Sequence, residues 1–366
     1  MKLALREMRR RPSRFVTATV ILSLIAALLM LLGGLLDGLI QSSTGALRAQ
    51  QAQAIVYSST SQASLVRSRI DPDIRQAIEQ INGVTAVGGL GSAQLGARVP
   101  GNGPRDLADV ALFGYELPPE GVPDPPPDGQ AYADEILKAD GVTEGMTIQL
   151  GPARTPVEVL GFVKDTAYNG QGSLWASAAT WRSVLAANRP DAQLAEGVFQ
   201  ALIVQGDADI AGRIDDATAG ATESLTVTEA VNAIPGVKEQ QSTFNQIIGV
   251  TIVIALVVIA LFFALLTVER SGMYGVLKAL GARSGTLFGG VVIQAVVVTA
   301  IASLLAAVLM VVLDALIPPG GIPLQITPVR IVFSAVLLLV AAVAGCLFSL
   351  RRVLRVDPAS AIGTTV

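Results

Sequence analysis

The chain has 366 residues, 51% hydrophobic and 15% charged, with a formal net charge of −3 and a mean hydropathy of +0.57. This composition excludes an ordinary soluble globular protein and indicates a membrane protein. The sequence has no histidine, one cysteine (Cys346) and no G-x-x-x-x-G-K-[ST] loop. It therefore excludes internal disulfides, zinc sites, histidine-based catalysis and ATP hydrolysis by the chain itself.

Residues 1–14 form a basic segment. Lys2, Arg6 and Arg10 recur at i, i+4 and i+8. With Arg9, they favour a cytoplasmic amphipathic helix whose cations lie on anionic lipid headgroups. Pro12 predicts the end of this helix before the first apolar run. An alternative stays open, in which the cations act only as a topology signal.

Four apolar runs follow, each at or above the roughly 20 residues that cross a bilayer as a helix. They occupy residues 15–36, 247–267, 287–313 and 331–350. The first run exceeds the ~7–15 apolar residues of a signal peptide, so we predict a retained anchor. The predicted transmembrane helices are residues 15–44 (including an extension), 241–267, 286–313 and 331–350, with an outer loop at 314–330. Gly33-Gly34 and Gly289-Gly290 would permit close packing, and Gln294 is a candidate dimer contact.

Residues 45–240 are predicted to form one inserted α/β domain. Asp71-Pro72 opens a helix on which Ile74, Ile78 and Ile81 share one face. Strands are expected at residues 147–150, 157–163 and 199–205, and a stiff proline-rich linker at 117–129. The acidic neighbours Asp134-Glu135 and Asp215-Asp216 are interpreted as solvated surface rather than as metal ligands or an acid–base pair.

Charge predicts the orientation of the spans. Segments 1–14, 268–285 and 351–366 together hold 12 basic and 3 acidic residues, whereas residues 45–240 hold 13 basic and 24 acidic residues. The Lys/Arg bias places both termini in the cytoplasm and the inserted domain outside. The fold class is therefore an α-helical membrane protein with four transmembrane helices and an extracytoplasmic α/β domain between the first and second. Nucleic-acid binding has no support, because topology accounts for the basic residues.

The segment VERSGMYGVLKALGARSG, residues 268–285, separates the second and third apolar runs. As a helix it would have two distinct faces. The apolar face consists of Met273, Val276, Leu277 and Leu280. The second, small-residue face consists of Gly272, Gly275, Ala279 and Ala282. Glu269, Arg270 and Lys278 are its polar remainder. Glycine inside a helix costs roughly 0.5–1 kcal/mol relative to alanine, so the small-residue face favours close approach of a cytoplasmic partner. The alternative is a connector that lies on the membrane surface.

This segment resembles the cytoplasmic coupling segment of MacB/FtsX-type ABC transporter permeases, whose usual form ends in L-[KR]-A-[LI]-G-A. The matching residues are Gly275, Leu277, Lys278, Ala279, Leu280, Gly281 and Ala282. Met273 departs from the glutamate that is common in the family, which removes one expected polar contact. The C-terminal stretch RVDPASAI, with Arg355, Asp357 and Pro358, is similar to the family's terminal R-x-x-P-x-x-A-[LI] motif.

The resemblance implies a permease subunit without catalysis of its own in a bacterial plasma membrane. Its partners would be two copies of a cytoplasmic ABC ATPase, a second permease copy and an extracytoplasmic protein. The ATP and magnesium would be bound by the ATPase copies. The implied activity is export or extraction of a hydrophobic or amphipathic substrate, or mechanotransmission. A receptor or adaptor without an ATPase and a membrane-anchored extracytoplasmic enzyme remain as alternatives.

Overall fold

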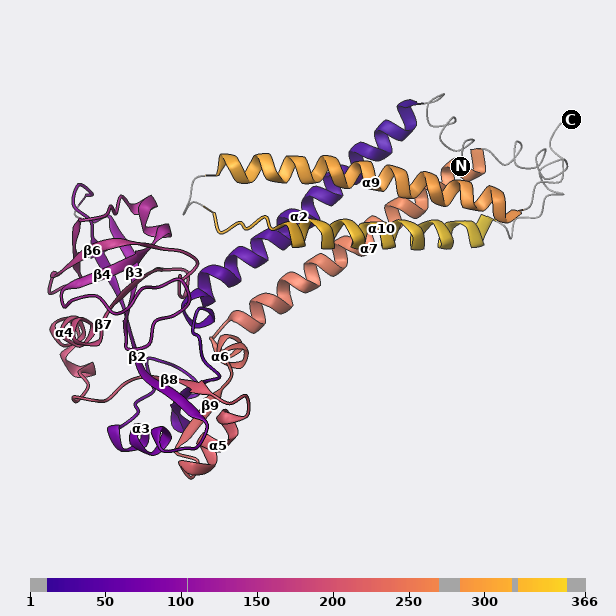
Figure 1. Cartoon of the computed structure of the whole chain (residues 1–366). Coiled ribbons are helices and arrows are strands. Elements are labelled where there is room, and N and C mark those ends of the chain that lie inside the picture. Colours follow the sequence, from indigo (N-terminus) through magenta and orange to yellow (C-terminus); the bar gives the residue numbers. More distant parts are fainter. Residues whose placement is uncertain (1–11, 104, 270–283, 318–321, 354–366) are drawn as a thin grey trace, which may run out of the picture. The chain divides into compact units, whose positions relative to one another are not determined.

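The computed structural model describes residues 12–103, 105–269, 284–317 and 322–353 (Figure 1). The helices are α2 (Pro12–Arg48), α3 (Pro72–Glu79), α4 (Ala178–Asn188), α5 (Ile210–Ala217), α6 (Val227–Ala233), α7 (Val237–Glu269), α9 (Ser284–Leu316) and α10 (Pro328–Val353). Short 3₁₀ helices are η1 (Ser59–Ser61), η2 (Glu135–Asp140) and η3 (Pro190–Ala192). The strands are β1 (Ala54–Ser58), β2 (Val84–Arg98), β3 (Leu107–Tyr115), β4 (Gln130–Asp134), β5 (Thr147–Leu150), β6 (Thr155–Val163), β7 (Gly172–Ser177), β8 (Ala201–Gly206) and β9 (Thr222–Leu225).

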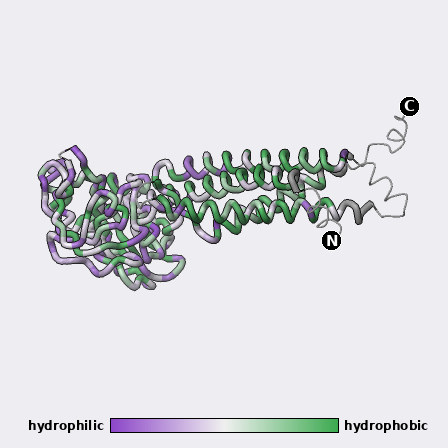
Figure 2. Tube along the Cα trace, turned by 90° about the horizontal axis from the view of Figure 1, so that it is seen from above, coloured by the Kyte–Doolittle hydropathy of each residue, from purple (hydrophilic) through white to green (hydrophobic). Residues whose placement is uncertain are grey.

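The chain divides into two compact units. The membrane unit comprises residues 1–37, 242–317 and 324–366, and the inserted unit comprises residues 38–241 and 318–323. Helices α2, α7, α9 and α10 are long and apolar enough to cross a membrane, and their apolar character is visible along the chain in Figure 2. This confirms four spans with a sheet-rich insertion between the first and second. The last turns of α2 belong to the inserted unit, which starts at Gly38 rather than at residue 45.

The membrane unit has a core in two layers, each built from all four helices. One layer joins the first turns of α2 and α9 to the last turns of α7 and α10: Phe15, Ala18, Leu22, Ile259, Phe263, Leu266, Val291, Ala295, Val298, Ala302, Ala342 and Cys346. The second layer occupies the other half of the helices: Ala26, Ala27, Leu29, Met30, Ala255, Ala306, Met310 and Leu338. The many alanines allow close helix approach, which suits a setting where van der Waals packing holds helices together.

Glycines fit this packing unevenly. A Cβ at Gly345 would lie 2.9 Å from the carbonyl oxygen of Leu256, so α7 and α10 touch at backbone level there. Gly289 and Gly290, which the sequence suggested as packing sites, have nothing within 4 Å of an added Cβ. Gln294 is buried among the chain's own helices at 3% exposure. It therefore offers little surface to a second copy of the chain.

The inserted unit is built on a closed barrel with a sheet extension. Strands β3, β7, β4, β6, β5 and β2 pair in that order, and pairing of β2 with β3 closes the ring. The sheet continues from β2 through β8 and β1 to β9. Strand β2 belongs to both parts because residues 84–90 pair with β8 and residues 90–98 pair with β3. Closure leaves the barrel strands without free edges, which protects them from pairing with other chains.

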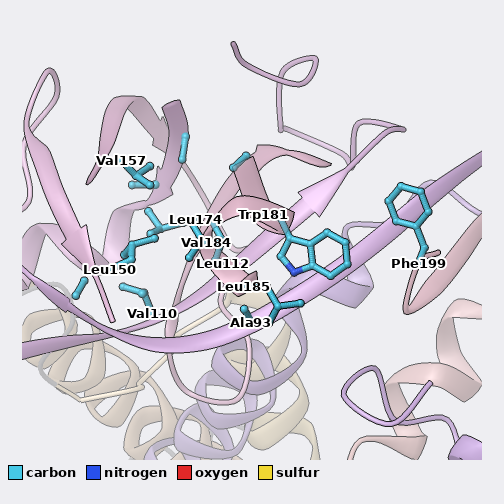
Figure 3. Packing of buried hydrophobic residues seen from close by; sticks show 14 of the residues in the cluster. Ala93, Val110, Leu112, Leu150, Val157, Leu174, Trp181, Val184, Leu185 and Phe199 are labelled. Carbon is cyan, nitrogen blue, oxygen red and sulfur yellow. The ribbon is translucent and has the colours of Figure 1, made fainter. Parts of the chain in front are cut away.

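The indole of Trp181, on helix α4, packs directly against the backbone of barrel strands β2 and β3. A Cβ at Gly91 of β2 or at Gly114 of β3 would overlap the side chain of Trp181. Figure 3 shows Trp181 between the aliphatic side chains of the barrel core and Phe199, whose ring lies 6.1 Å from the indole and nearly parallel to it. The guanidinium of Arg182 lies 4.4 Å from the centre of the Phe199 ring. Glycine is required at these strand positions because the indole occupies the space of a side chain.

A second buried cluster on the sheet is aromatic. Phe113 stacks on Trp175 with ring centres 4.7 Å apart and meets Tyr168 edge-on at 5.4 Å. Burial raises the pKa of Tyr168 to about 12, so its hydroxyl stays protonated at physiological pH. Ala46 and Leu47, from the last turns of α2, belong to this cluster. These turns are therefore anchored in a hydrophobic core.

The sequence located several elements of this unit correctly. Strand β5 covers the expected residues 147–150, β6 contains 157–163, and β8 covers most of 199–205. Helix α3 starts at Pro72 as expected but ends at Glu79, so Ile81 lies beyond it. The proline-rich residues 117–129 form the link between β3 and β4, where the carbonyl oxygen of Pro123 accepts a hydrogen bond from the Tyr115 hydroxyl at 2.7 Å.

The surface interpretation of Asp134 is wrong. Its side chain is buried at 1% exposure, where it accepts hydrogen bonds from the backbone of Ile136 and from both the backbone and the hydroxyl of Thr166. The Thr166 hydroxyl also lies 2.7 Å from that of Ser173. Burial raises the pKa of Asp134 and the nearby Asp165 adds to the rise, while these hydrogen bonds oppose it. Asp134 is thus a structural acid that ties the start of η2 to the β6–β7 loop.

The same β6–β7 loop is bonded to the end of α2. The backbone N–H groups of Asn169 and Gly170 donate to the carbonyl oxygens of Ser43 and Ser42 at 3.1 and 3.0 Å. The backbone N–H of Ala46 donates to the carbonyl oxygen of Ala167 at 3.1 Å. A Cβ at Gly45 would lie 2.5 Å from the carbonyl oxygen of Asp165. Gly45 therefore lets the loop reach the helix backbone.

Candidate functional site

One end of the membrane unit carries the attachment points of all three predicted functional segments. Helices α2 and α9 begin there, and α7 and α10 end there. Segment 268–285 joins α7 to α9, segment 1–14 precedes the start of the first span, and the tail from residue 351 follows α10. We call this the coupling end. A shared apolar layer, with Phe263 fully buried in it, connects the four helices immediately behind it.

The residues proposed for coupling lie mostly outside the described part of the chain. Glu269, the last residue of α7, is described and its side chain is exposed. The others lie in 1–11, 270–283 and 354–366, which the structure does not describe: Lys2, Arg6, Arg9, Arg10, Arg270, Gly272, Met273, Gly275, Leu277, Lys278, Ala279, Leu280, Gly281, Arg355, Asp357 and Pro358. Their proposed roles stay predictions.

The opposite end of the membrane unit contains a charged site that the sequence patterns did not reveal. Arg330, in the first turn of α10, forms a two-pronged ion pair with Asp37 of α2. Its Nε donates to Asp37 Oδ2 at 2.7 Å, and its Nη2 donates to Oδ1. Both side chains are mostly covered, at 22% and 27% exposure. Paired hydrogen bonds of this kind fix orientation as well as distance.

The surroundings of the pair are shaped to receive the arginine. A Cβ at Gly33 would lie 2.7 Å from Cδ of Arg330, so the missing side chain leaves room for the arginine stem. At Gly34, the carbonyl oxygen accepts a hydrogen bond from the N–H of Gln325 at 3.0 Å. Thr327 caps the start of α10, because its hydroxyl accepts from the backbone N–H of Arg330 at 3.2 Å. Gly33 and Gly34 therefore permit close packing as expected. Gly33 packs against Arg330, and Gly34 packs against residues 324–326.

The interior between the two ends is nearly apolar. A small pocket between α2 and α7 is lined by six apolar side chains: Ala18, Ile21, Leu22, Val258, Ile259 and Phe262. It offers no polar group that would orient a ligand. Thr299 and Ser303 bury hydroxyls without a hydrogen-bond partner. Among the residues that the structure describes, no group of three or more acidic or cysteine side chains could hold a metal ion.

Comparison with known proteins found similar permeases. The model of the FtsX-like permease C-terminal domain matches residues 245–358. The chain is 21% identical over 366 residues to a protein of Staphylococcus haemolyticus (strain JCSC1435) named as a hemin transport system permease protein, HrtB. It is 20% identical over 363 residues to its namesake in Staphylococcus epidermidis (strain RP62A), and both alignments cover 99% of each chain.

One similar solved structure is the periplasmic region of MacB from Actinobacillus actinomycetemcomitans. It is 11% identical, with a TM-score of 0.36, and the match covers 52% of this chain and 96% of that one. The family model spans the second, third and fourth membrane helices, and the relatives that match over the whole chain are named as permeases. The chain is therefore similar to the FtsX-like permeases over residues 245–358 and to transport-system permeases over its whole length.

Proposed function

We propose that this permease couples ATP hydrolysis by a separate cytoplasmic ABC ATPase to movement of its inserted domain. The observation that carries the proposal is the family match over residues 245–358, which includes all of segment 268–285. The grouping of helix ends at the coupling end supports it, because one docked ATPase could then act on α7, α9 and α10 together. The chain itself has no phosphate-binding loop, so the ATP must bind elsewhere.

The proposed substrate is hydrophobic or amphipathic. The membrane unit offers apolar surfaces and an apolar pocket, and four helices per chain are too few to enclose a wide polar channel. Hemin, the molecule in the names of the staphylococcal relatives, belongs to this class. We propose a homodimer with two ATPase subunits as the working assembly, and mechanotransmission to an extracytoplasmic protein as the alternative output.

Co-purification tests the proposed function. The full-length chain, expressed with the ABC ATPase encoded beside it, should purify as a stable complex of two permease and two ATPase subunits. The chain alone should hydrolyse no ATP, and the complex should hydrolyse it at a rate that a panel of amphipathic compounds, hemin included, changes. A chain that binds no ATPase but responds to an external ligand would instead support a receptor.

Thiol labelling tests the orientation. Cysteine at Ala187 or Asp191, both exposed on the inserted unit, should react with a membrane-impermeant reagent in intact cells. Cysteine at Ser284, within the cationic segment 268–285, should react only after lysis, because the Lys/Arg bias holds that segment in the cytoplasm. The natural Cys346 is buried and serves as an unreactive background. Labelling of Ser284→Cys in intact cells would reverse the orientation.

A further inference from the structure

Charged residues are rare in the spans and their connections. Within residues 15–44, 241–267 and 286–350 the sequence has three: Asp37, Asp314 and Arg330. Two of these three form the ion pair described above, whereas Asp314 near the end of α9 is exposed. Charged side chains near a bilayer are costly unless they are paired or reach water, so such residues are usually functional. The pair therefore calls for a role beyond ordinary packing.

The pair is one of several contacts that tie two chain segments together. Residues 33–37 of α2 meet residues 325–330 through the ion pair, through the backbone hydrogen bond between Gly34 and Gln325, and through the fit of Arg330 over Gly33. A Cβ at Gly34 would lie 2.9 Å from the carbonyl oxygen of Gln325, so the approach is at backbone level. We call this set the α2–α10 brace, formed by Gly33, Gly34, Asp37, Gln325 and Arg330.

The brace joins a helix that leads to the coupling end, α10, to a helix that leads into the inserted unit, α2. Helix α10 runs from Arg330 to the coupling end, where it leads into the tail with Arg355 and Pro358. Helix α2 continues beyond Asp37 into the inserted unit, where its last turns are bonded to the β6–β7 loop. The brace is therefore the point at which a displacement of α10 can pass to the helix that enters the inserted unit.

We propose that Asp37 and Arg330 are positioning residues that make α2 and α10 move as one body during the transport cycle. The bidentate geometry suits this role because it resists both sliding and rotation, which a single point charge would not. The inference rests on the proposed function for its role in coupling. The physical part, that the pair holds the two helices in one arrangement, can be tested without an ATPase.

The functional arm is a double-mutant cycle in the permease–ATPase complex with Asp37→Asn, Arg330→Gln and the double variant. Each single variant should still bind the ATPase but lose coupled activity by roughly tenfold, the factor that corresponds to one lost charge-assisted hydrogen bond. The double variant should be no worse than the singles, because the two groups act as a unit. Arg330→Lys should recover only part of the activity, and Asp314→Asn, which removes an unbraced exposed charge, should keep all of it.

The structural arm uses spin labels on the permease alone. With Cys346 replaced by alanine, labels at the exposed Leu28 and Val332 report the arrangement of α2 against α10. The distance distribution should be narrow in the wild type and broaden in Asp37→Asn. An unchanged distribution, or single variants with full coupled activity, would overturn the brace. Failure of the wild-type complex to couple would refute the proposed function instead, and the label distances would still decide whether the pair holds the helices.

Discussion

Gly275→Trp should abolish stimulation of the partner ATPase while leaving the permease in the membrane. The sequence predicts a helix in segment 268–285 that would place Gly275 on a small-residue face with Gly272, Ala279 and Ala282. An indole on this face would hold the segment away from a docked partner whose backbone must come close. Insertion depends on the flanking apolar helices, so expression should persist. The measurements are co-purification of the ATPase and its hydrolysis rate in the same membranes.

Two further variants sharpen this experiment. Lys278→Glu should also weaken docking, because reversing a charge at an interface introduces like-charge repulsion. Gly212→Trp is the matched control: it adds the same indole to α5, where an added Cβ meets nothing within 4 Å. Normal partner binding and normal activity in Gly275→Trp would mean that residues 272–282 form only a connector on the membrane surface.

Gly91→Ala should unfold the inserted unit at a markedly lower temperature. The added methyl group would overlap the indole of Trp181, which is fully buried, so either β2 or α4 must shift. Overpacking of this kind typically costs about 1–3 kcal/mol. Trp181→Ala should cost about 3–5 kcal/mol through lost burial and the cavity it leaves. Calorimetry of the full-length chain in detergent measures both effects.

The double variant Gly91→Ala/Trp181→Ala separates steric overlap from general strand weakening. The cavity left by the indole should accept the new methyl group, so the double variant should be clearly more stable than the sum of the single effects predicts. Gly212→Ala, in an open helical position, should leave stability unchanged or raise it by about 0.5–1 kcal/mol. Additive losses would contradict the packing of Trp181 on Gly91.

The spans could be predicted because their signal is local. A run of apolar residues long enough to cross a bilayer is rare in soluble domains, and residues 247–267 contain no charge at all. The barrel could not be predicted in the same way. Its closure depends on pairing of β2 with β3 and of β3 with β7, and β2 contains glycines that lower its intrinsic strand signal. The requirement for glycine at Gly89 and Gly91 becomes clear only in the folded structure, where Phe199 and Trp181 pack directly over them.

Individual polar residues were the hardest to predict. Asp134 and Glu135 are adjacent, yet one is buried as a cap and the other pairs with Lys138 on the surface. Sequence alone does not show which of two neighbouring acids points inward. Asp37 and Arg330 are 293 residues apart, so no local pattern links them. Their scarcity as charges among apolar spans was the available signal.

The bonds between the β6–β7 loop and α2 bear on the kind of motion that can enter the inserted unit. A helix held only by nonspecific apolar contacts could rotate about its own axis without breaking a hydrogen bond. Here the backbone of Ser42, Ser43 and Ala46 is bonded to the loop on one side, and Gly45 brings the two backbones together. Turning these last residues of α2 would carry the loop with them, and through Thr166 and Asp134 the barrel strands as well. Torque as well as axial thrust can therefore pass from this helix into the barrel.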